Sequence, residues 1–317
     1  MDIEQRMDPE LREVFRSMPP LTITGDPVAA RRMFADMLKA MGIGQVRNDE
    51  VSVEDHTIPG VNGSPGVPVR VYASSHRQGP SAGLLWIHGG GFIVGNLDQD
   101  DLLCTGIVQH VGCVVVSVDY RLAPEHPFPA APDDCFLALK WMVSVAPVLG
   151  LDPARLAVGG GSAGGCLAAA VALMARDFKG PDIVFQLLIY PVLDDRLVTP
   201  SSYDVTDRRT WNRESAIGSW NAYLGAKHGG DVSPYAAPAR AADLTGLPPT
   251  YILVAGLDLL RDEAIEYASR LMQAGVTTDL HVFSGTAHAF DVWAPEAAVT
   301  RRAISEYRQA IRLALRR

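Results

Sequence analysis

The sequence predicts an α/β fold with a mostly parallel central sheet. From about residue 83 onward, short apolar segments rich in β-branched residues alternate with longer helical segments, and this alternation is typical of α/β architecture. The apolar segments carry few polar residues, as strands do when both faces of a parallel sheet are covered. The 317 residues, of which 48% are hydrophobic, are enough for one large core with a small accessory part.

The predicted strands and helices follow one another in a regular order. The strands are residues 83–88, 114–119, 156–158, 183–190, 250–254 and 280–283. The helices are residues 134–145, 163–176, 262–274 and 297–315. In the last of these helices, Ala303, Tyr307 and Ile311 recur at helical spacing, which gives the helix one apolar face to lay on the sheet.

Two segments lie outside this alternation. Residues 1–45 are predicted to form helices, with an amphipathic stretch at 28–40, and residues 195–235 are polar, aromatic and irregular. We expect both to form a cap on a core made of residues 46–194 and 236–317. The aromatic residues of the second segment suit either the walls of a pocket or the packing of a cap onto the core, and both interpretations stay open for Tyr203, Trp211, Trp220 and Tyr223.

Charge and composition exclude several classes of protein. The net charge is −8, which repels phosphate backbones, so nucleic acid is not an expected partner. The N-terminus has no apolar stretch of the secretory kind, and the longest apolar run, residues 163–175, is shorter than the roughly 17–25 residues of a spanning helix. We therefore expect a cytoplasmic protein without a membrane partner.

The four cysteines do not share a metal-ligand spacing. They lie at Cys104, Cys113, Cys135 and Cys166. In a chain without an export signal, such cysteines are typical of reduced thiols in the core. We expect neither a disulfide nor a zinc or other metal site.

A candidate nucleophile lies in residues 160–164, Gly-Gly-Ser-Ala-Gly, which have the pattern G-x-S-x-G. The pattern directly follows a predicted strand and directly precedes a predicted helix. In that setting a sharp turn lifts a serine hydroxyl above the sheet edge, and the helix N-terminus faces a developing negative charge. The alternative, a glycine-rich phosphate turn, is disfavoured because the spacing G-x-G-x-x-G is absent. The motif predicts Ser162 as the nucleophile.

A second motif, residues 88–92, His-Gly-Gly-Gly-Phe, ends the first predicted strand. Consecutive glycines leave backbone amides free to point at a substrate oxygen, and with the amide of Ala163 they would form an oxyanion hole. A flexible turn is the alternative. Both motifs follow strand C-termini, where α/β sheets bind their ligands.

The base and the acid follow from chain order, which in this arrangement is serine, acid, histidine. Only His281 and His288 lie late enough, and His281 is inside a predicted strand, so His288 in the following loop is the predicted base. The preceding strand-end loop offers Asp258, Asp262 and Glu263. Asp258 is closest to the strand end, whereas the other two lie where a helix begins and are explained by capping and the helix dipole.

The sequence resembles the hormone-sensitive-lipase-like family of bacterial esterases, of the α/β-hydrolase type, from about residue 65 to the C-terminus. The resemblance rests on the joint occurrence of residues 88–92, 119–125, 160–165, 246–249, 258–263 and 288–290 in this order. It implies that residues 46–194 and 236–317 form an α/β-hydrolase catalytic core. It also implies that the protein hydrolyses short- to medium-chain esters without cofactor or metal. It also implies a Ser162, Asp258 and His288 triad and an oxyanion hole of the Gly90, Gly91 and Ala163 amides, with Gly89 shaping the turn.

Three positions depart from the family pattern. Gly161, Leu259 and Ala289 stand where the family usually has Asp, Pro and Gly. None removes a reacting group, but the missing carboxylate at position 161 changes the polar support of the nucleophile turn. Residues 119–125 are interpreted as a structural network that braces the oxyanion loop.

Alternatives remain at the level of function. A small-molecule receptor on the same fold would bind without turnover, although His288 argues against it, because plant receptors that resemble this family have lost this histidine. The same triad would also serve an amide, lactone or carbamate hydrolase. A homodimer stays open, since proteins that resemble this chain commonly dimerise through a sheet edge or the last helix.

Overall fold

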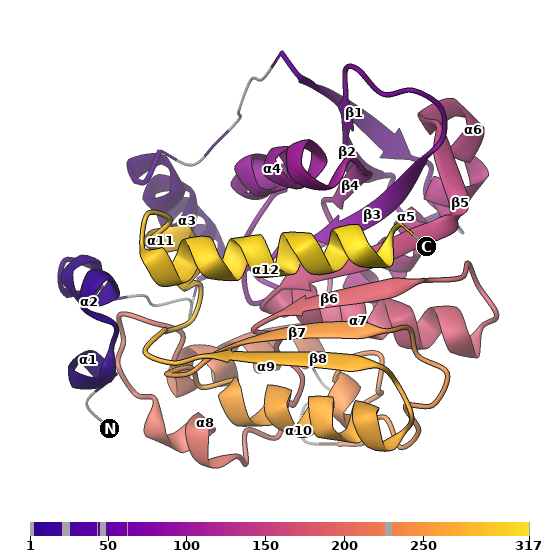
Figure 1. Ribbon diagram of the computed structural model, residues 1–317. Coiled ribbons are helices and arrows are strands. Elements are labelled where there is room, and N and C mark those ends of the chain that lie inside the picture. The colour runs from indigo at the N-terminus through magenta and orange to yellow at the C-terminus, as the bar shows by residue number, and fades with distance from the viewer. Residues whose placement is uncertain are drawn as a thin grey trace.

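The computed structural model describes residues 3–20, 26–42, 44, 49–61, 63–225 and 230–316. Its sheet has eight strands: β1 (Val51–Ile58), β2 (Val67–Ser74), β3 (Ser81–Ile87), β4 (Val114–Val118), β5 (Leu151–Gly161), β6 (Phe185–Ile189), β7 (Thr250–Ala255) and β8 (Thr278–Phe283). They are arranged in the order β1-β2-β4-β3-β5-β6-β7-β8 (Figure 1). β1 and β2 pair in antiparallel fashion, as do β2 and β4, and the remaining pairs are parallel. The predicted α/β fold with a mostly parallel sheet is confirmed.

Helices cover both faces of this sheet. They are α1 (Ile3–Arg6), α2 (Pro9–Arg16), α3 (Pro27–Ala40), α4 (Asp101–Val111), α5 (Ala130–Ser144), α6 (Ala146–Leu149), α7 (Ala163–Asp177), α8 (Pro200–Asp204), α9 (Arg213–Leu224), α10 (Arg261–Gln273), α11 (Phe290–Trp293) and α12 (Ala298–Ala314), with 3-10 helices η1 (Leu97–Asp100) and η3 (Pro238–Arg240). α4 and α12 pack on one face, and α5, α7 and α10 pack on the other (Figure 1). Across the described ranges, no helix is both long and apolar enough to cross a membrane.

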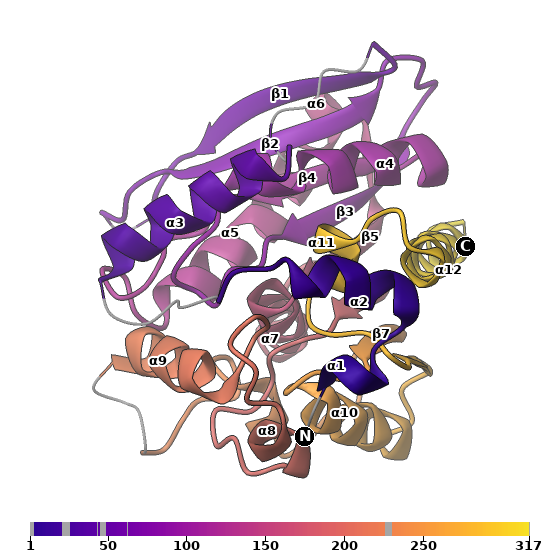
Figure 2. The ribbon, with the colours of Figure 1, turned by 90° about the vertical axis from the view of Figure 1, so that its left-hand side faces the viewer.

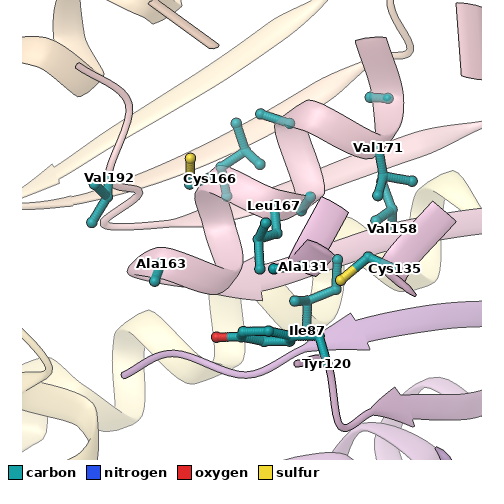
Figure 3. Close-up of a cluster of buried hydrophobic side chains, with 14 of the residues drawn as sticks. Ile87, Tyr120, Ala131, Cys135, Val158, Ala163, Cys166, Leu167, Val171 and Val192 are labelled. Atoms are coloured by element: carbon teal, nitrogen blue, oxygen red, sulfur yellow. The ribbon is translucent and has the colours of Figure 1, made fainter. Parts of the chain in front are cut away.

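The two faces have separate cores because strand side chains alternate between them. In β4, Val114 and Val116 belong to the core beneath α5 and α7, while Val115 belongs to the core beneath α4 and α12. Figure 3 shows the first core, where Leu167 of α7 lies near Ala131 of α5. The parallel strands are buried on both faces, as their continuous apolar sequences predict.

Some elements differ from the sequence prediction. Strands β1 and β2 and helix α4 lie outside the predicted series, and α5 begins at Ala130 rather than at residue 134. β1 is an edge strand of alternating polar character with mostly exposed side chains, so it lacks the continuous apolar sequence of a buried strand. The face predicted for the last helix is confirmed, because Ala303, Tyr307 and Ile311 of α12 are buried.

The N-terminal helices lie over the end of the sheet at which the parallel strands stop. Figure 2 looks onto this end, with α1, α2, α3 and α11 toward the viewer. The expected boundary at residues 45 and 46 falls outside the described residues, as do residues 226–229 of the second cap segment. The division into cap and core stays a prediction.

Candidate active site

Ser162 lies in a strained turn between β5 and α7. Its backbone has φ 57° and ψ −119°, a region that non-glycine residues adopt at a cost of about 1–3 kcal/mol. Three hydrogen bonds hold the turn: the Ser162 amide donates to the Ile189 carbonyl at 2.9 Å, and the Ser162 carbonyl accepts from the amides of Cys166 and Val192, each at 3.1 Å. The turn places the hydroxyl at the C-terminal edge of the sheet.

The glycines on either side of this turn allow the helix to approach the sheet closely. A Cβ on Gly164 would lie 2.0 Å from the Ile87 carbonyl oxygen, and one on Gly160 would lie 2.4 Å from the Gly164 carbonyl. Any side chain there would force β3, β5 and α7 apart. Gly161 is different, because its Cβ would meet only Tyr190 at 3.6 Å, so the departure from the family pattern at this position is not imposed by space.

His288 bridges the predicted nucleophile and the predicted acid. Its Nε2 lies 2.9 Å from Ser162 Oγ, and its Nδ1 lies 2.6 Å from Asp258 Oδ2. Asp258 is 1% exposed, and its other oxygen accepts from the Leu260 amide at 3.1 Å. The structure thus brings together three side chains that are up to 126 positions apart in the sequence.

The residues not chosen for the triad have other contacts. His281 lies in β8 with its ring stacked on Tyr251 and its Nδ1 2.9 Å from Glu306. Asp262 and Glu263 do not cap their own helix: their carboxylates accept from the amides of Ser201 and Leu193, both at 2.7 Å. The capping interpretation was therefore wrong, because the two acids fasten α10 to α8 and to the loop before it. Both acids do lie in the first turn of α10, as the helix-dipole interpretation expects.

The predicted oxyanion residues surround the nucleophile turn. Gly90 and Gly91 have φ of +119° and +58°, which glycine adopts readily. A Cβ on Gly89 would lie 3.0 Å from the Gly161 carbonyl oxygen, so the two glycine turns are in contact. Among the described residues, the amides of Gly90, Gly91 and Ala163 have no hydrogen-bond acceptor, which leaves them available to a substrate oxygen.

Residues 119–125 brace this loop through Tyr120 and through Ala123, whose amide donates to the Phe92 carbonyl at 2.9 Å. The Tyr120 hydroxyl donates to the His88 carbonyl at 3.0 Å, and the two rings stack at 4.2 Å. Arg121 instead pairs with Asp134 of α5 at 2.7 Å. Glu125 pairs with Arg31 of α3 at 2.6 Å, and this arginine also donates to the Ile93 carbonyl at 2.8 Å. The network therefore ties helix α3 to the loop, a contact that the sequence did not indicate.

A cavity of about 230 Å³ opens above Ser162 and His288. Its walls come from α3, the oxyanion loop, the loop before α9, and α11, and they are largely apolar. The wall residues include Met33, Phe34, Met37, Leu38, Trp86, Leu103, Ile189, Tyr190, Trp211, Val292 and Trp293. Such a lining with a few convergent polar groups is typical of a small-molecule site.

The four aromatic residues that the sequence left open divide between the two interpretations. Trp211 lines the cavity. Trp220 and Tyr223 are buried in the core, where the Tyr223 ring stacks on Phe92 at 4.0 Å. Tyr203 is 56% exposed. One residue is therefore a pocket wall, and two pack helix α9 against the oxyanion loop in the core.

Two carboxyl groups on the cavity wall were not found by sequence reasoning. Asp100, at the end of η1, and Asp291, in α11, both line the cavity. Burial raises the pKa of Asp100 to about 6 and also raises the pKa of Asp291. Position 291, three residues after His288, was the available signal. Across the described residues, no group of three or more metal-binding side chains is assembled.

Replacing Asp100 with asparagine is expected to stabilise the fold at neutral pH. The folded-state pKa of about 6 lies above the value of 3.8 that is ordinary for an aspartate. The ionised carboxylate therefore destabilises the fold by an amount that grows as the pH rises between these two values and persists above about pH 6. Asparagine still accepts from Trp86 and carries no charge. Thermal unfolding should show a gain of about 1–2 kcal/mol near pH 8 that vanishes near pH 4. An equal gain at both pH values would contradict this reasoning.

Comparison with known proteins gives one consistent result. The family model described as "alpha/beta hydrolase fold" matches residues 84–292. Esterase LipI of Mycobacterium tuberculosis is 36% identical over 316 residues, covering 99% of this chain and 97% of that protein. Carboxylesterase NlhH of the same organism is 36% identical and covers 96% of each chain. The solved structure titled "Bacterial Heroin Esterase" superposes with a TM-score of 0.95 at 44% identity over 99% of each chain.

Proposed function

Because the chain belongs to the α/β-hydrolase-fold family, in its hormone-sensitive-lipase-like branch, we propose that it hydrolyses carboxylic esters through Ser162, His288 and Asp258. The family predicted from the motifs is confirmed. The protein is a carboxylesterase, since proteins named esterase and carboxylesterase are 36–44% identical to it over nearly the whole chain. The assignment of the triad is our proposal.

The proposed mechanism is acyl transfer through a covalent intermediate. His288 Nε2 accepts the proton of Ser162 Oγ, which attacks the ester carbonyl and forms a tetrahedral oxyanion. The imidazolium then donates that proton to the leaving alcohol, and a water molecule, deprotonated by His288, releases the acid and restores the serine. The observation that supports this mechanism is the continuous chain of two short contacts, 2.9 Å and 2.6 Å, from the hydroxyl to the carboxylate.

The proposed oxyanion hole consists of the amides of Gly90, Gly91 and Ala163. Their lack of other acceptors among the described residues supports this role. Preorganised donors of this kind are each worth about 10²–10³ in kcat. Gly89 allows the close contact between the two turns, and its amide is not one of the proposed donors to the oxyanion.

We further propose short- to medium-chain acyl esters as substrates. The apolar cavity of about 230 Å³ supports this substrate class, since an acyl chain would replace water against the side chains of α3 and Trp211. A series of nitrophenyl esters of increasing acyl length tests the proposal, with the highest kcat/KM expected in the short to medium range.

Labelling by a fluorophosphonate probe tests the triad and separates the enzyme from a receptor. The probe reacts only with an activated serine, so we expect one label per chain, mapped by mass spectrometry to Ser162. A chain that binds small molecules without turnover would stay unlabelled. Comparison of matched ester and amide substrates decides between ester and amide hydrolysis by the same triad.

The buried cysteines and the acidic net charge bear on the location and the partners of the protein. We propose a cytoplasmic protein, in line with four cysteines that are all buried and free, because disulfides are rare in reducing compartments. The acidic net charge of −8 supports substrates other than nucleic acid. A homodimer stays a prediction that light scattering tests.

A further inference from the structure

Two carboxylates face the same apolar cavity as the proposed nucleophile. Asp100 Oδ2 accepts from the indole N–H of Trp86 at 2.7 Å, and Asp291 Oδ1 accepts from the hydroxyl of Tyr190 at 2.7 Å. Both donors are neutral, and within the described part of the chain neither carboxylate forms an ion pair. Both acids are partly buried and line the cavity together with Ser162. The largely apolar wall around Ser162 therefore contains two acidic side chains.

The cation on the cavity wall does not neutralise these acids. Arg209 lines the cavity, but its guanidinium pairs with Asp207 at 2.7 Å and with Glu4 at 3.1 Å. Burial raises the pKa of Asp100, and the nearby charge of Asp291 raises it further. A carboxylate taken out of water without a counter-charge is costly, so a cation brought into the cavity would be strongly favoured.

Aromatic rings on the same walls add a second feature that favours a cation. Trp86, Tyr190, Trp211 and Trp293 all line the cavity, and the faces of such rings attract ammonium groups by cation–π interaction. Trp211 is only 5% exposed, and its indole N–H is buried without a partner among the described residues. As a hydrogen-bond donor this N–H does not itself attract a cation, so the attraction comes from the ring faces and the two carboxylates.

From this placement we propose that the cavity selects esters that carry a cationic amine or quaternary ammonium group, with the positive charge facing Asp100 and Asp291. The proposal rests on the ester hydrolase function and names its substrate class. The carboxylates attract the ammonium group of the substrate, and the aromatic walls replace the water that surrounds this group in solution. The bound ammonium group then orients the ester toward Ser162. Asp100 and Asp291 are specificity-determining residues in this account.

A matched pair of acetate esters tests this selection. Acetylcholine carries a trimethylammonium group where 3,3-dimethylbutyl acetate carries a neutral tert-butyl group of the same shape, so the pair differs in charge alone. At about pH 8, where a carboxylate with a pKa of about 6 is ionised, the wild-type kcat/KM should favour the cationic ester by about tenfold or more. That factor corresponds to about 1.4 kcal/mol.

Substituting each acid tests whether the preference for the cationic ester arises from the cavity. In Asp100→Asn and in Asp291→Asn the ratio of the two kcat/KM values should fall severalfold, with the neutral ester as the internal reference. Asp279→Asn is the matched control: it removes the same unit charge from an exposed position in β8 that does not line the cavity. Its ratio should equal that of the wild type.

Inhibition of the wild-type protein gives a readout that needs no variant. Choline should inhibit hydrolysis of nitrophenyl butyrate with a Ki about tenfold or more below that of neutral 3,3-dimethylbutanol. Equal Ki values, equal kcat/KM for the two acetates, or a ratio that survives in both asparagine variants would overturn the proposal. Failure to hydrolyse any ester, nitrophenyl acetate included, would instead refute the proposed function.

Discussion

Replacing Ser162 with alanine is expected to lower kcat for nitrophenyl acetate by several orders of magnitude, in line with losses of about 10⁶-fold when a triad nucleophile is removed. Without the hydroxyl, His288 has no proton to accept at 2.9 Å and no acyl-enzyme forms. The free amides of the proposed oxyanion hole stay in place, so a small residual rate above water is expected. KM should change much less than kcat.

The control for this variant is Ser144→Ala. Ser144 is an exposed serine in α5 whose hydroxyl donates to the Trp141 carbonyl at 2.8 Å, and it does not line the cavity. The control should keep the wild-type rate and the fluorophosphonate label, and Ser162→Ala should lose both. Unchanged hydrolysis by the Ser162 variant, with its purity established by mass spectrometry, would falsify the assignment of the nucleophile.

Sequence reasoning led to the proposed triad because each of its members stands at a strand end. Parallel strands bring their C-terminal ends to one edge of the sheet, so Ser162 after β5, Asp258 after β7 and His288 after β8 meet without any knowledge of the loops between them. Chain order left His281 and His288, and the position of His281 inside the strand, now β8, removed it. The parallel strands from β3 onward were predictable because both of their faces are buried, which makes their sequences continuously apolar.

The remaining features depend on contacts that have no local pattern. Strand β1 pairs with β2 at the sheet edge, where only weak burial acts on its side chains, so its sequence shows no continuous apolar run. The contact of Arg31 with Glu125 joins segments 94 positions apart. Asp100 and Asp291 look like ordinary surface acids in the sequence, and only the folded chain places them on an apolar wall.

Asp100 and Asp291 are expected to affect both the stability of the fold and the proposed preference for cationic esters. A buried carboxylate without a counter-ion lowers the stability of the unliganded fold, and a cationic substrate would recover part of that cost on binding. The same Asp100→Asn variant is therefore expected to unfold at a higher temperature and to discriminate less between charged and neutral esters. Such opposite changes are typical of residues kept for function at the expense of stability.

Replacing Asp258 with asparagine is expected to lower kcat by about 10⁴-fold while the site geometry stays intact. The ionised carboxylate holds the proton on Nδ1 of His288 at 2.6 Å, which leaves Nε2 free to accept the proton of Ser162. The asparagine amide donates a hydrogen bond instead, so the ring takes the opposite tautomer and Nε2 carries a proton when it should accept one. The kcat for nitrophenyl acetate measures this loss.

The matched control for Asp258 is Asp262→Asn, because it removes the same charge from the first turn of α10, directly after the loop that holds Asp258. The Asp262 carboxylate accepts from the Ser201 amide rather than from His288, and an asparagine oxygen can still accept that bond. Circular dichroism verifies that both variants are folded. A carboxylate that fixes the tautomer of the base must affect kcat far more than a neighbouring carboxylate does. If kcat falls by less than about tenfold in Asp258→Asn, or by the same factor in both variants, then Asp258 only supports the loop.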